Sequence, residues 1–264
     1  MKRRTMILGS LALSASLLLS ACGGSAASSQ AASSEAAASS AAASSEASGE
    51  SVQLTVFAAA SLTETLNEIA EQYKTVAPNV ELVFNFDSSG TLKTQIEEGA
   101  DCDLFLSAAQ KQMNGLQDED LINTDTRIDL LENKVVLAVP EGNPADIQSF
   151  EDIGTDKCKL IALGNDDVPV GSYSVEILTN LGILDELESS NKITYGSNVK
   201  EVTTQVKEAA ADCGIVYAPD AFSAGLETVD EATPEECSQV IYPAALTAST
   251  EHADEAQAFL DYLT

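Results

Sequence analysis

The sequence is poor in the residues on which many enzymes and metal sites depend. It has one histidine, His252, which lies in an acidic segment near the C-terminus. A serine hydrolase needs a base beside its nucleophile, and the chain has neither a second histidine nor a Gly-x-Ser-x-Gly motif. No two cysteines are spaced as a metal-binding pair, which argues against zinc. The number of acidic residues alone does not exclude a pair of carboxylates for glycoside hydrolysis, but most acids in so acidic a chain are solvated. We therefore expect that the protein is not an enzyme.

Basic residues are also scarce. Thirteen lysines and arginines stand against 42 aspartates and glutamates, for a formal net charge of −29. Such a surface repels nucleic acid and anionic lipid. It repels a free anion at long range as well, so any anion site in this chain must work through fixed hydrogen-bond donors at short range.

The N-terminal region has the parts of a bacterial export signal in order. Lys2, Arg3 and Arg4 precede an apolar run from Met6 to Leu19, which is too short for a stable membrane-spanning helix, and Leu-Ser-Ala-Cys ends at Cys22. This pattern predicts a lipoprotein signal peptide over residues 1–21 and lipidation of Cys22. A plain signal peptide with an accidental cysteine is the alternative.

Residues 22–50 are almost entirely serine and alanine with scattered glutamate, a composition that cannot bury enough apolar surface to fold. We therefore expect a disordered tether that holds the protein at the extracytoplasmic face of the cell membrane through the lipid on Cys22. No later hydrophobic stretch is long enough to span a bilayer.

Beyond Cys22 the chain has four cysteines, Cys102, Cys158, Cys213 and Cys237. An even number in an exported chain permits disulfides without requiring them. If a bridge exists, we favour Cys158 with Cys237, because each precedes an apparent strand.

From residue 51 onward, strand and helix patterns alternate, which predicts mainly parallel sheets covered by helices. The expected strands are 54–58, 80–86, 103–106, 134–139, 160–163, 214–218 and 241–246. Helical spacing of apolar residues is seen over 62–76, around Leu92 and Ile96, around Tyr173 and Ile177, over 199–209 and over 253–263. In both halves a helix runs into a near-identical junction, Ala100-Asp101-Cys102-Asp103 or Ala211-Asp212-Cys213-Gly214, and then a hydrophobic strand. The two halves therefore echo each other.

Several predicted helices begin with small polar residues directly after a strand, and such helix starts suit an anion. Each also has an ordinary interpretation. Ser61 to Glu64 is a capping box, Asn198 to Glu201 can be a helix cap, and Ser88-Ser89-Gly90 can be a simple turn. Tyr217 can be a core aromatic whose hydroxyl reaches solvent.

Five segments together resemble the periplasmic molybdate-binding protein family of ABC importers. They are Val56 to Thr63, Asp87 to Leu92, Ala100 to Ala108, Val168 to Tyr173 and Gly214 to Tyr217, in the family's order and spread over nearly all of residues 52–264. The resemblance implies a two-lobed class II periplasmic-binding-protein fold, α/β in class, with one oxyanion in the interlobe cleft. We expect lobe 1 to comprise residues 51–135 and 245–264, and lobe 2 residues 136–244.

The resemblance also implies the site. The family's ligand-binding positions, two serines, two backbone amides and one tyrosine hydroxyl, fall here on Ser61, Ser89, Val170, Val199 and Tyr217. These groups contact the oxygens of the oxyanion and are not direct metal ligands. Two departures stand out: Gly90 replaces a serine found in many members, which we expect to alter loop flexibility, and relatives usually continue through another helix after the position of Thr264.

The ligand chemistry fits a site of donors without lysine or arginine. A protonated phosphate would bring an O–H that needs an acceptor, and a buried unpaired donor costs on the order of 1–3 kcal/mol. Molybdate, tungstate and sulfate are fully deprotonated near neutral pH. We expect a monomeric protein that binds molybdate, and tungstate with it, needs no cofactor and delivers its ligand to ABC permease subunits. Sulfate or another tetrahedral oxyanion is the alternative ligand, and a structural surface lipoprotein without a small ligand is the alternative class.

Overall fold

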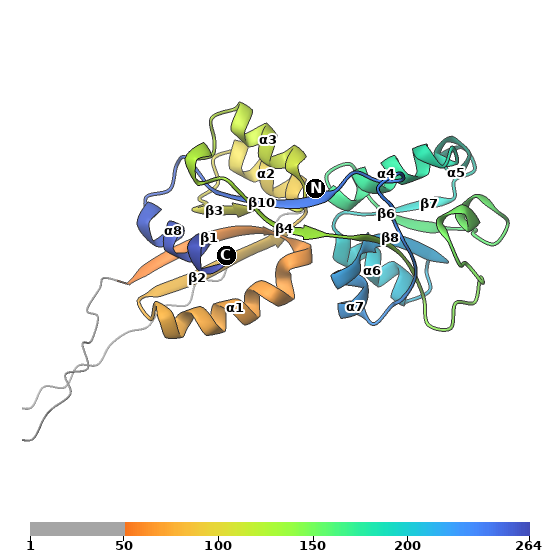
Figure 1. The fold of residues 1–264 in the computed structure, drawn as a ribbon, viewed down its shortest axis with the longest axis horizontal. Coiled ribbons are helices and arrows are strands. Elements are labelled where there is room, and N and C mark those ends of the chain that lie inside the picture. The colour runs from red at the N-terminus through yellow and green to blue at the C-terminus, as the bar shows by residue number, and fades with distance from the viewer. Residues whose placement is uncertain (1–50) are drawn as a thin grey trace, which may run out of the picture. The chain divides into compact units, whose positions relative to one another are not determined.

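The computed structural model describes residues 51–264, which form two five-stranded sheets, each with its own helices (Figure 1). The predicted signal peptide, Cys22 and the tether lie outside the described residues. We call the first sheet with its helices lobe 1 and the second sheet with its helices lobe 2. No helix in residues 51–264 is long and apolar enough to cross a membrane.

Lobe 1 is built on a sheet in the order β2-β1-β3-β10-β4. Its strands are β1 (Val52–Ala59), β2 (Val80–Asp87), β3 (Leu104–Leu106), β4 (Ile128–Asn133) and β10 (Val240–Leu246). Its helices are η1 (Ala60–Leu62), α1 (Thr63–Val76), α2 (Ser89–Glu97), α3 (Gln110–Asp118), η2 (Thr124–Thr126) and α8 (Ala253–Tyr262).

Lobe 2 is built on a sheet in the order β7-β6-β8-β5-β9. Its strands are β5 (Val135–Val139), β6 (Ile161–Gly164), β7 (Ile193–Gly196), β8 (Cys213–Tyr217) and β9 (Glu227–Glu231). Its helices are η3 (Phe150–Gly154), α4 (Pro169–Asn180), α5 (Leu184–Ser189), α6 (Val199–Lys207) and α7 (Ala218–Ala224).

The two sheets have the same topology. In each, three strands run parallel, the fourth is antiparallel to them, and the fifth is antiparallel to the fourth. The fourth strand is the one that arrives from the other lobe: β5 follows β4, and β10 returns after β9. This explains why the sheets are mixed rather than wholly parallel. The echo seen in the sequence is confirmed, because the two Ala-Asp-Cys junctions lead into β3 and β8, the equivalent third strands.

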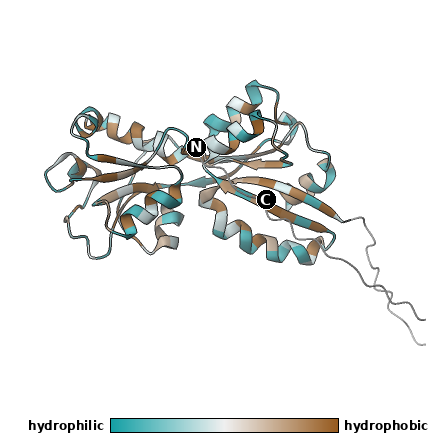
Figure 2. Cartoon of the chain, turned by 180° about the vertical axis from the view of Figure 1, so that it is seen from behind, coloured by the Kyte–Doolittle hydropathy of each residue, from teal (hydrophilic) through white to brown (hydrophobic). Residues whose placement is uncertain are grey.

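Sequence periodicity accounts for the packing of the main elements. α1 buries Leu66, Ala70 and Tyr73 on one face, and Tyr73 packs against Phe259 of α8 with ring centroids 5.0 Å apart. All five residues of β5 are buried, as expected of a continuous apolar strand inside a covered sheet. Figure 2 shows the same division, with brown apolar segments along the strands and helices that carry both teal and brown faces.

Two strands lie across the lobe boundaries predicted from the sequence. β5 begins at Val135 and β10 begins at Val240, so the predicted borders at 135/136 and 244/245 each fall inside a strand. A division by sheet would place the crossings between Asn133 and Val135 and before Val240. The apolar residues of β10 give no sign of which sheet they join, because they are buried in either case.

The cysteine pairing favoured from the sequence is wrong. The four described cysteines are free thiols, and the Sγ atom of Cys158 lies 3.7 Å from that of Cys213. Asp212 brings these two segments together by accepting hydrogen bonds from the Lys159 and Leu160 amides. The Cys237 thiol instead donates to the carbonyl of Ser238.

Candidate functional site

The equivalent strand ends of the two lobes meet at one small cavity. In lobe 1 these ends lead to Ser61 after β1, Ser89 after β2 and Ala108 after β3. In lobe 2 the matching ends lead to Val170 after β6, Val199 after β7 and Tyr217 at the end of β8. The cavity holds about 10 Å³, and its lining consists of Ala59, Ala60, Ser61, Asp87, Ser88, Ser89, Ala108, Val168, Pro169, Val199 and Tyr217. Four of the five predicted site residues therefore line one cavity, and Val170 follows Pro169 directly.

Ser61 does not form the capping box that its sequence suggests. Neither η1 nor α1 has a side-chain cap. The Ser61 hydroxyl instead lies 2.9 Å from the hydroxyl of Tyr242, a β10 residue 181 positions away. The side chain is therefore available to the cavity rather than committed to its own helix.

Ser88 and Ser89 have different roles at the start of α2. The Ser88 hydroxyl accepts the Thr91 amide at 3.1 Å and donates to the Thr91 hydroxyl at 2.8 Å, so it caps the helix with both its hydrogen and its lone pair. The Ser89 hydroxyl accepts the amide of Ala108 at 3.0 Å. Its own hydrogen is not used in that bond, so Ser89 can donate to a ligand.

Lobe 2 offers backbone amides at two helix starts. Val199 is the first residue of α6 and Val170 the second of α4, positions where an amide has no intrahelical acceptor. The cap predicted at Asn198 is confirmed, because its side chain accepts from the Glu201 amide at 3.1 Å. That cap satisfies the third amide of α6 and leaves the Val199 amide at the positive end of the helix.

Tyr217 is buried, so the idea that its hydroxyl reaches solvent is wrong. It is 1% exposed, and its hydroxyl donates to the Ala108 carbonyl at 3.2 Å, which joins lobe 2 to lobe 1. Burial raises the pKa of Tyr217 well above its ordinary value. The hydroxyl therefore keeps its proton and acts as a donor.

Two further contacts join the lobes beside the cavity. The Gly90 amide donates to the Asp167 carbonyl at 2.9 Å, and a Cβ atom on Gly90 would lie 2.4 Å from that carbonyl oxygen. The absence of a side chain at Gly90 thus permits close approach of the lobes, a more specific role than the loop flexibility expected from the sequence. The Lys200 ammonium pairs with Glu64 of α1 at 2.7 Å.

Lys200 also lies 3.0 Å from the Asp220 carboxylate, which is buried in lobe 2. Burial raises the pKa of Asp220 to about 6, although Lys200 and its positive charge act in the opposite direction. Lys200 therefore connects an exposed acid of lobe 1 with a buried acid of lobe 2.

The cavity has no cationic side chain in its lining and offers mainly hydroxyl and amide donors. None of its lining residues is a lysine, arginine or histidine, and no cluster of three potential metal-ligating side chains occurs within residues 51–264. The one acid in the lining, Asp87, uses a carboxylate oxygen to accept the Ser88 amide at 2.7 Å. Hydroxyls and helix-start amides can stabilise an anion by oriented dipoles.

The sequence did not identify the residues that position the site residues or link the lobes through long-range hydrogen bonds. Tyr242 and Asn133 support Ser61, and Lys200 links the lobes; all three contacts join segments far apart in the chain. Tyr242 stood inside a predicted core strand, and no local pattern distinguishes it from an ordinary buried aromatic.

Comparison with known proteins decides the family. The model of the bacterial extracellular solute-binding proteins matches residues 54–264. The chain belongs to this family. The resemblance to molybdate-binding proteins is also confirmed, and with it the α/β class and the two-lobed periplasmic-binding fold.

Three relatives illustrate how far the similarity extends. This solute-binding protein is 37% identical to the molybdate-binding protein ModA of Haemophilus influenzae, over 81% of this chain and 85% of that protein. It is likewise 37% identical to ModA of Escherichia coli, over 82% of this chain and 85% of the relative. Among solved structures, the periplasmic molybdate-binding protein of Azotobacter vinelandii matches with a TM-score of 0.72 and 25% identity, over 80% of this chain and 92% of that one.

Proposed function

We propose that this protein is the extracytoplasmic, lipid-anchored solute-binding component of an ABC importer, and that it captures molybdate, and tungstate with it, without catalysing a reaction. The observation that carries the proposal is the cavity in which both lobes place donors from equivalent strand ends. The relatives named ModA, which are molybdate-binding proteins, support the choice of ligand.

The five proposed contacts are the Ser61 and Ser89 hydroxyls, the Val170 and Val199 amides and the Tyr217 hydroxyl. A set of five donors favours an oxyanion that carries no proton of its own, because each donor needs an oxygen lone pair and an O–H group of the ligand would oppose it at that position. Binding would bridge the lobes and stabilise their closed arrangement, which is the form that permease subunits could recognise. Since Tyr217 already donates to Ala108, it must redirect its hydrogen when a ligand is bound.

Calorimetric titration tests the proposal against molybdate, tungstate, sulfate and phosphate at neutral pH. We expect one-to-one binding of the first two and little response to the others. Tight binding of sulfate would favour sulfate or another tetrahedral oxyanion as the ligand. If none of the four anions binds, the result would favour a surface lipoprotein that has no small oxyanion ligand.

Two hydroxyl deletions test the site itself. Ser61→Ala and Tyr217→Phe each remove one donor to a charged ligand, so we expect affinity to fall by roughly tenfold or more while the fold is retained. Ser189→Ala is the matched control, because the exposed Ser189 hydroxyl donates to the Glu186 carbonyl within α5 and lies outside the cavity lining. Wild-type affinity in both site variants would contradict the assignment.

A further inference from the structure

The proton of the Ser61 hydroxyl has a direction that the surrounding hydrogen bonds determine. The hydroxyls of Ser61 and Tyr242 lie 2.9 Å apart, and distance alone does not say which one donates. A third group decides the matter. The side-chain amide of Asn133 donates to the Tyr242 hydroxyl at 3.0 Å.

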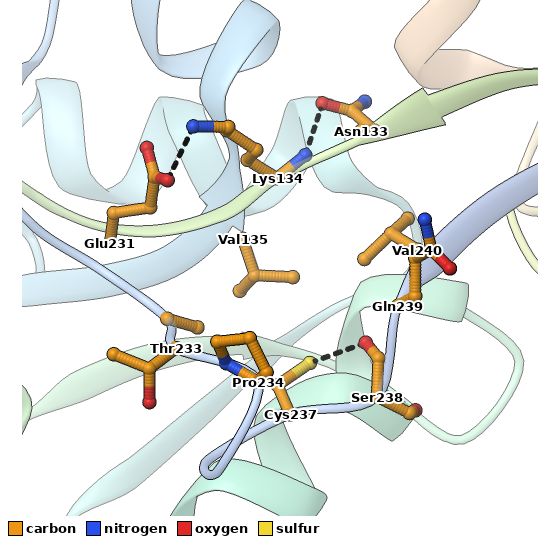
Figure 3. Close-up of a pocket in the computed structure, with 11 residues that line it drawn as sticks. Asn133, Lys134, Val135, Glu231, Thr233, Pro234, Cys237, Ser238, Gln239 and Val240 are labelled. Atoms are coloured by element: carbon orange, nitrogen blue, oxygen red, sulfur yellow. Dashed lines mark hydrogen bonds and ion pairs between the residues drawn. The ribbon is translucent and has the colours of Figure 1, made fainter.

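The orientation of the Asn133 amide is itself fixed. Its oxygen accepts the backbone amide of Lys134 at 2.8 Å, as Figure 3 shows, so its nitrogen must face Tyr242. Asn133 ends β4, and β5 begins at Val135, so this amide lies at the crossing from lobe 1 to lobe 2. A cavity of about 420 Å³ lies between this crossing and the returning segment before β10.

These contacts favour Tyr242 as the donor to Ser61. Tyr242 is 1% exposed, and burial raises its pKa far above the ordinary value, so its hydroxyl keeps the proton. If Ser61 donated to Tyr242 as well as Asn133, the buried Tyr242 hydrogen would lose its acceptor at 2.9 Å and would depend on the neighbouring Tyr217 hydroxyl alone. With Tyr242 as donor, Ser61 accepts one hydrogen bond and has its own hydrogen left for the cavity.

We propose that Asn133 and Tyr242 are positioning residues that order these protons, so that Ser61 presents a hydrogen rather than a lone pair to the bound oxyanion. This inference rests on the proposed function and deepens it, because it assigns selectivity for a fully deprotonated oxyanion to residues outside the cavity. Ser89 also keeps its hydrogen for the bound oxyanion, because its hydroxyl oxygen accepts the backbone amide of Ala108.

The substitution Asn133→Asp reverses the direction of the hydrogen bond between residue 133 and Tyr242. One carboxylate oxygen can still accept from Lys134, but the other takes the hydrogen of Tyr242. The Tyr242 oxygen then becomes an acceptor that competes with the bound oxyanion for the Ser61 hydrogen. Titration of the purified full chain in detergent, with molybdate and with phosphate at pH 7.5, measures the effect. We expect molybdate affinity to fall roughly tenfold to a hundredfold and the ratio of molybdate to phosphate affinity to narrow at least about tenfold, because hydrogen phosphate can donate to Ser61.

Four variants control this test. Gln239→Glu adds the same charge in the same cavity lining but leaves intact the hydrogen bonds from Asn133 to Tyr242 and from Tyr242 to Ser61, which we call the relay. Its ratio of molybdate to phosphate affinity should therefore stay at the wild-type value. Asn133→Ala removes the donor without adding charge and should narrow the ratio a few-fold, which keeps the test valid if the aspartate variant fails to fold. In Asn133→Asp with Tyr242→Phe the relay is cut, and the ratio should return to that of Tyr242→Phe alone.

The outcomes separate the two claims. Wild-type binding of molybdate with an unchanged ratio in both Asn133 variants would overturn the relay and leave the proposed function standing. A change in Asn133→Asp equal to that in Gln239→Glu would also overturn it, since charge alone would then explain the loss. No molybdate binding by the wild type would overturn the proposed function and the relay with it.

Discussion

The two lobes present the same three strand ends to the cavity but use different chemistry there. Lobe 1 places serine hydroxyls after β1 and β2, and each serine is held by a hydrogen bond from elsewhere in lobe 1. Lobe 2 places backbone amides at the starts of α4 and α6, together with the hydroxyl of Tyr217 at the end of β8. Lobe 1 thus contributes side-chain hydroxyls alone, whereas lobe 2 contributes two backbone amides and the Tyr217 hydroxyl. The two halves of the site should therefore respond to different substitutions.

The largest effect should come from blocking the approach of the lobes. Gly90→Ala places a Cβ atom 2.4 Å from the Asp167 carbonyl oxygen, where only backbone could move aside. If the contact costs the closed arrangement about 1–3 kcal/mol, as overpacking usually does, molybdate affinity should fall up to about a hundredfold. Calorimetric titration measures the loss.

Gly115→Ala is the matched control for that change. Its added Cβ would meet the end of the Lys93 side chain, which can move, and it lies in α3 of lobe 1. Equal affinity of Gly90→Ala and wild type would show that the contact between Gly90 and Asp167 is not needed for binding.

A backbone donor can be removed by proline where the helix begins. Val199 is the first residue of α6, a position that tolerates proline, and Asn198 before it is extended, with φ −154° and ψ 171°. Val199→Pro should therefore keep the helix but delete one amide, and lower molybdate affinity by roughly tenfold. Circular dichroism and titration of the same sample check both parts.

Val199→Ala completes this test of the difference between the lobes. It retains the amide, so affinity should stay within about threefold of the wild type despite some lost packing. If alanine and proline weaken binding equally, the Val199 side chain rather than its amide serves the site.

Much of this architecture could be predicted from local patterns. Uniformly apolar runs such as 135–139, and helical spacing such as Leu66, Ala70 and Tyr73, identify buried strands and amphipathic helices. Short polar elements could not be recognised in this way. β9, with the sequence Glu-Thr-Val-Asp-Glu, is mostly exposed at the sheet edge, so no alternation of apolar residues distinguishes it from a loop.

In the candidate site, too, the residues with a local sequence signal could be predicted and their distant partners could not. Helix starts after strands point to Ser89 and Val199 because the signal is local. The partners that give those groups a direction are remote: Tyr242 meets Ser61 across 181 residues, and Lys200 meets Glu64 across 136. Such pairings depend on tertiary packing, and for the same reason the contact between Cys158 and Cys213 was missed.

The smallest effect on affinity should come from the ion pairs of Lys200, which lie outside the cavity lining. Glu64→Gln removes a partly exposed pair between the lobes, an interaction worth about 0–1 kcal/mol, so affinity should change less than about fivefold. Asp220→Asn should leave affinity closer still to wild type, because Asp220 bonds within lobe 2. Its effect should appear instead in stability against pH.

The sign of that effect follows from the raised pKa. Folding lifts the pKa of Asp220 from 3.8 to about 6, so the folded protein holds a proton that the unfolded chain loses first. Stability linked to this group is therefore full below about pH 4 and is lost as pH rises through 6. Relative to the wild type, Asp220→Asn should gain roughly 3 kcal/mol between pH 4 and pH 7, measured by urea unfolding. Parallel stability curves for the two proteins would mean that Lys200 keeps Asp220 ionised in the fold, and the buried acid of lobe 2 would then behave like the exposed acid of lobe 1.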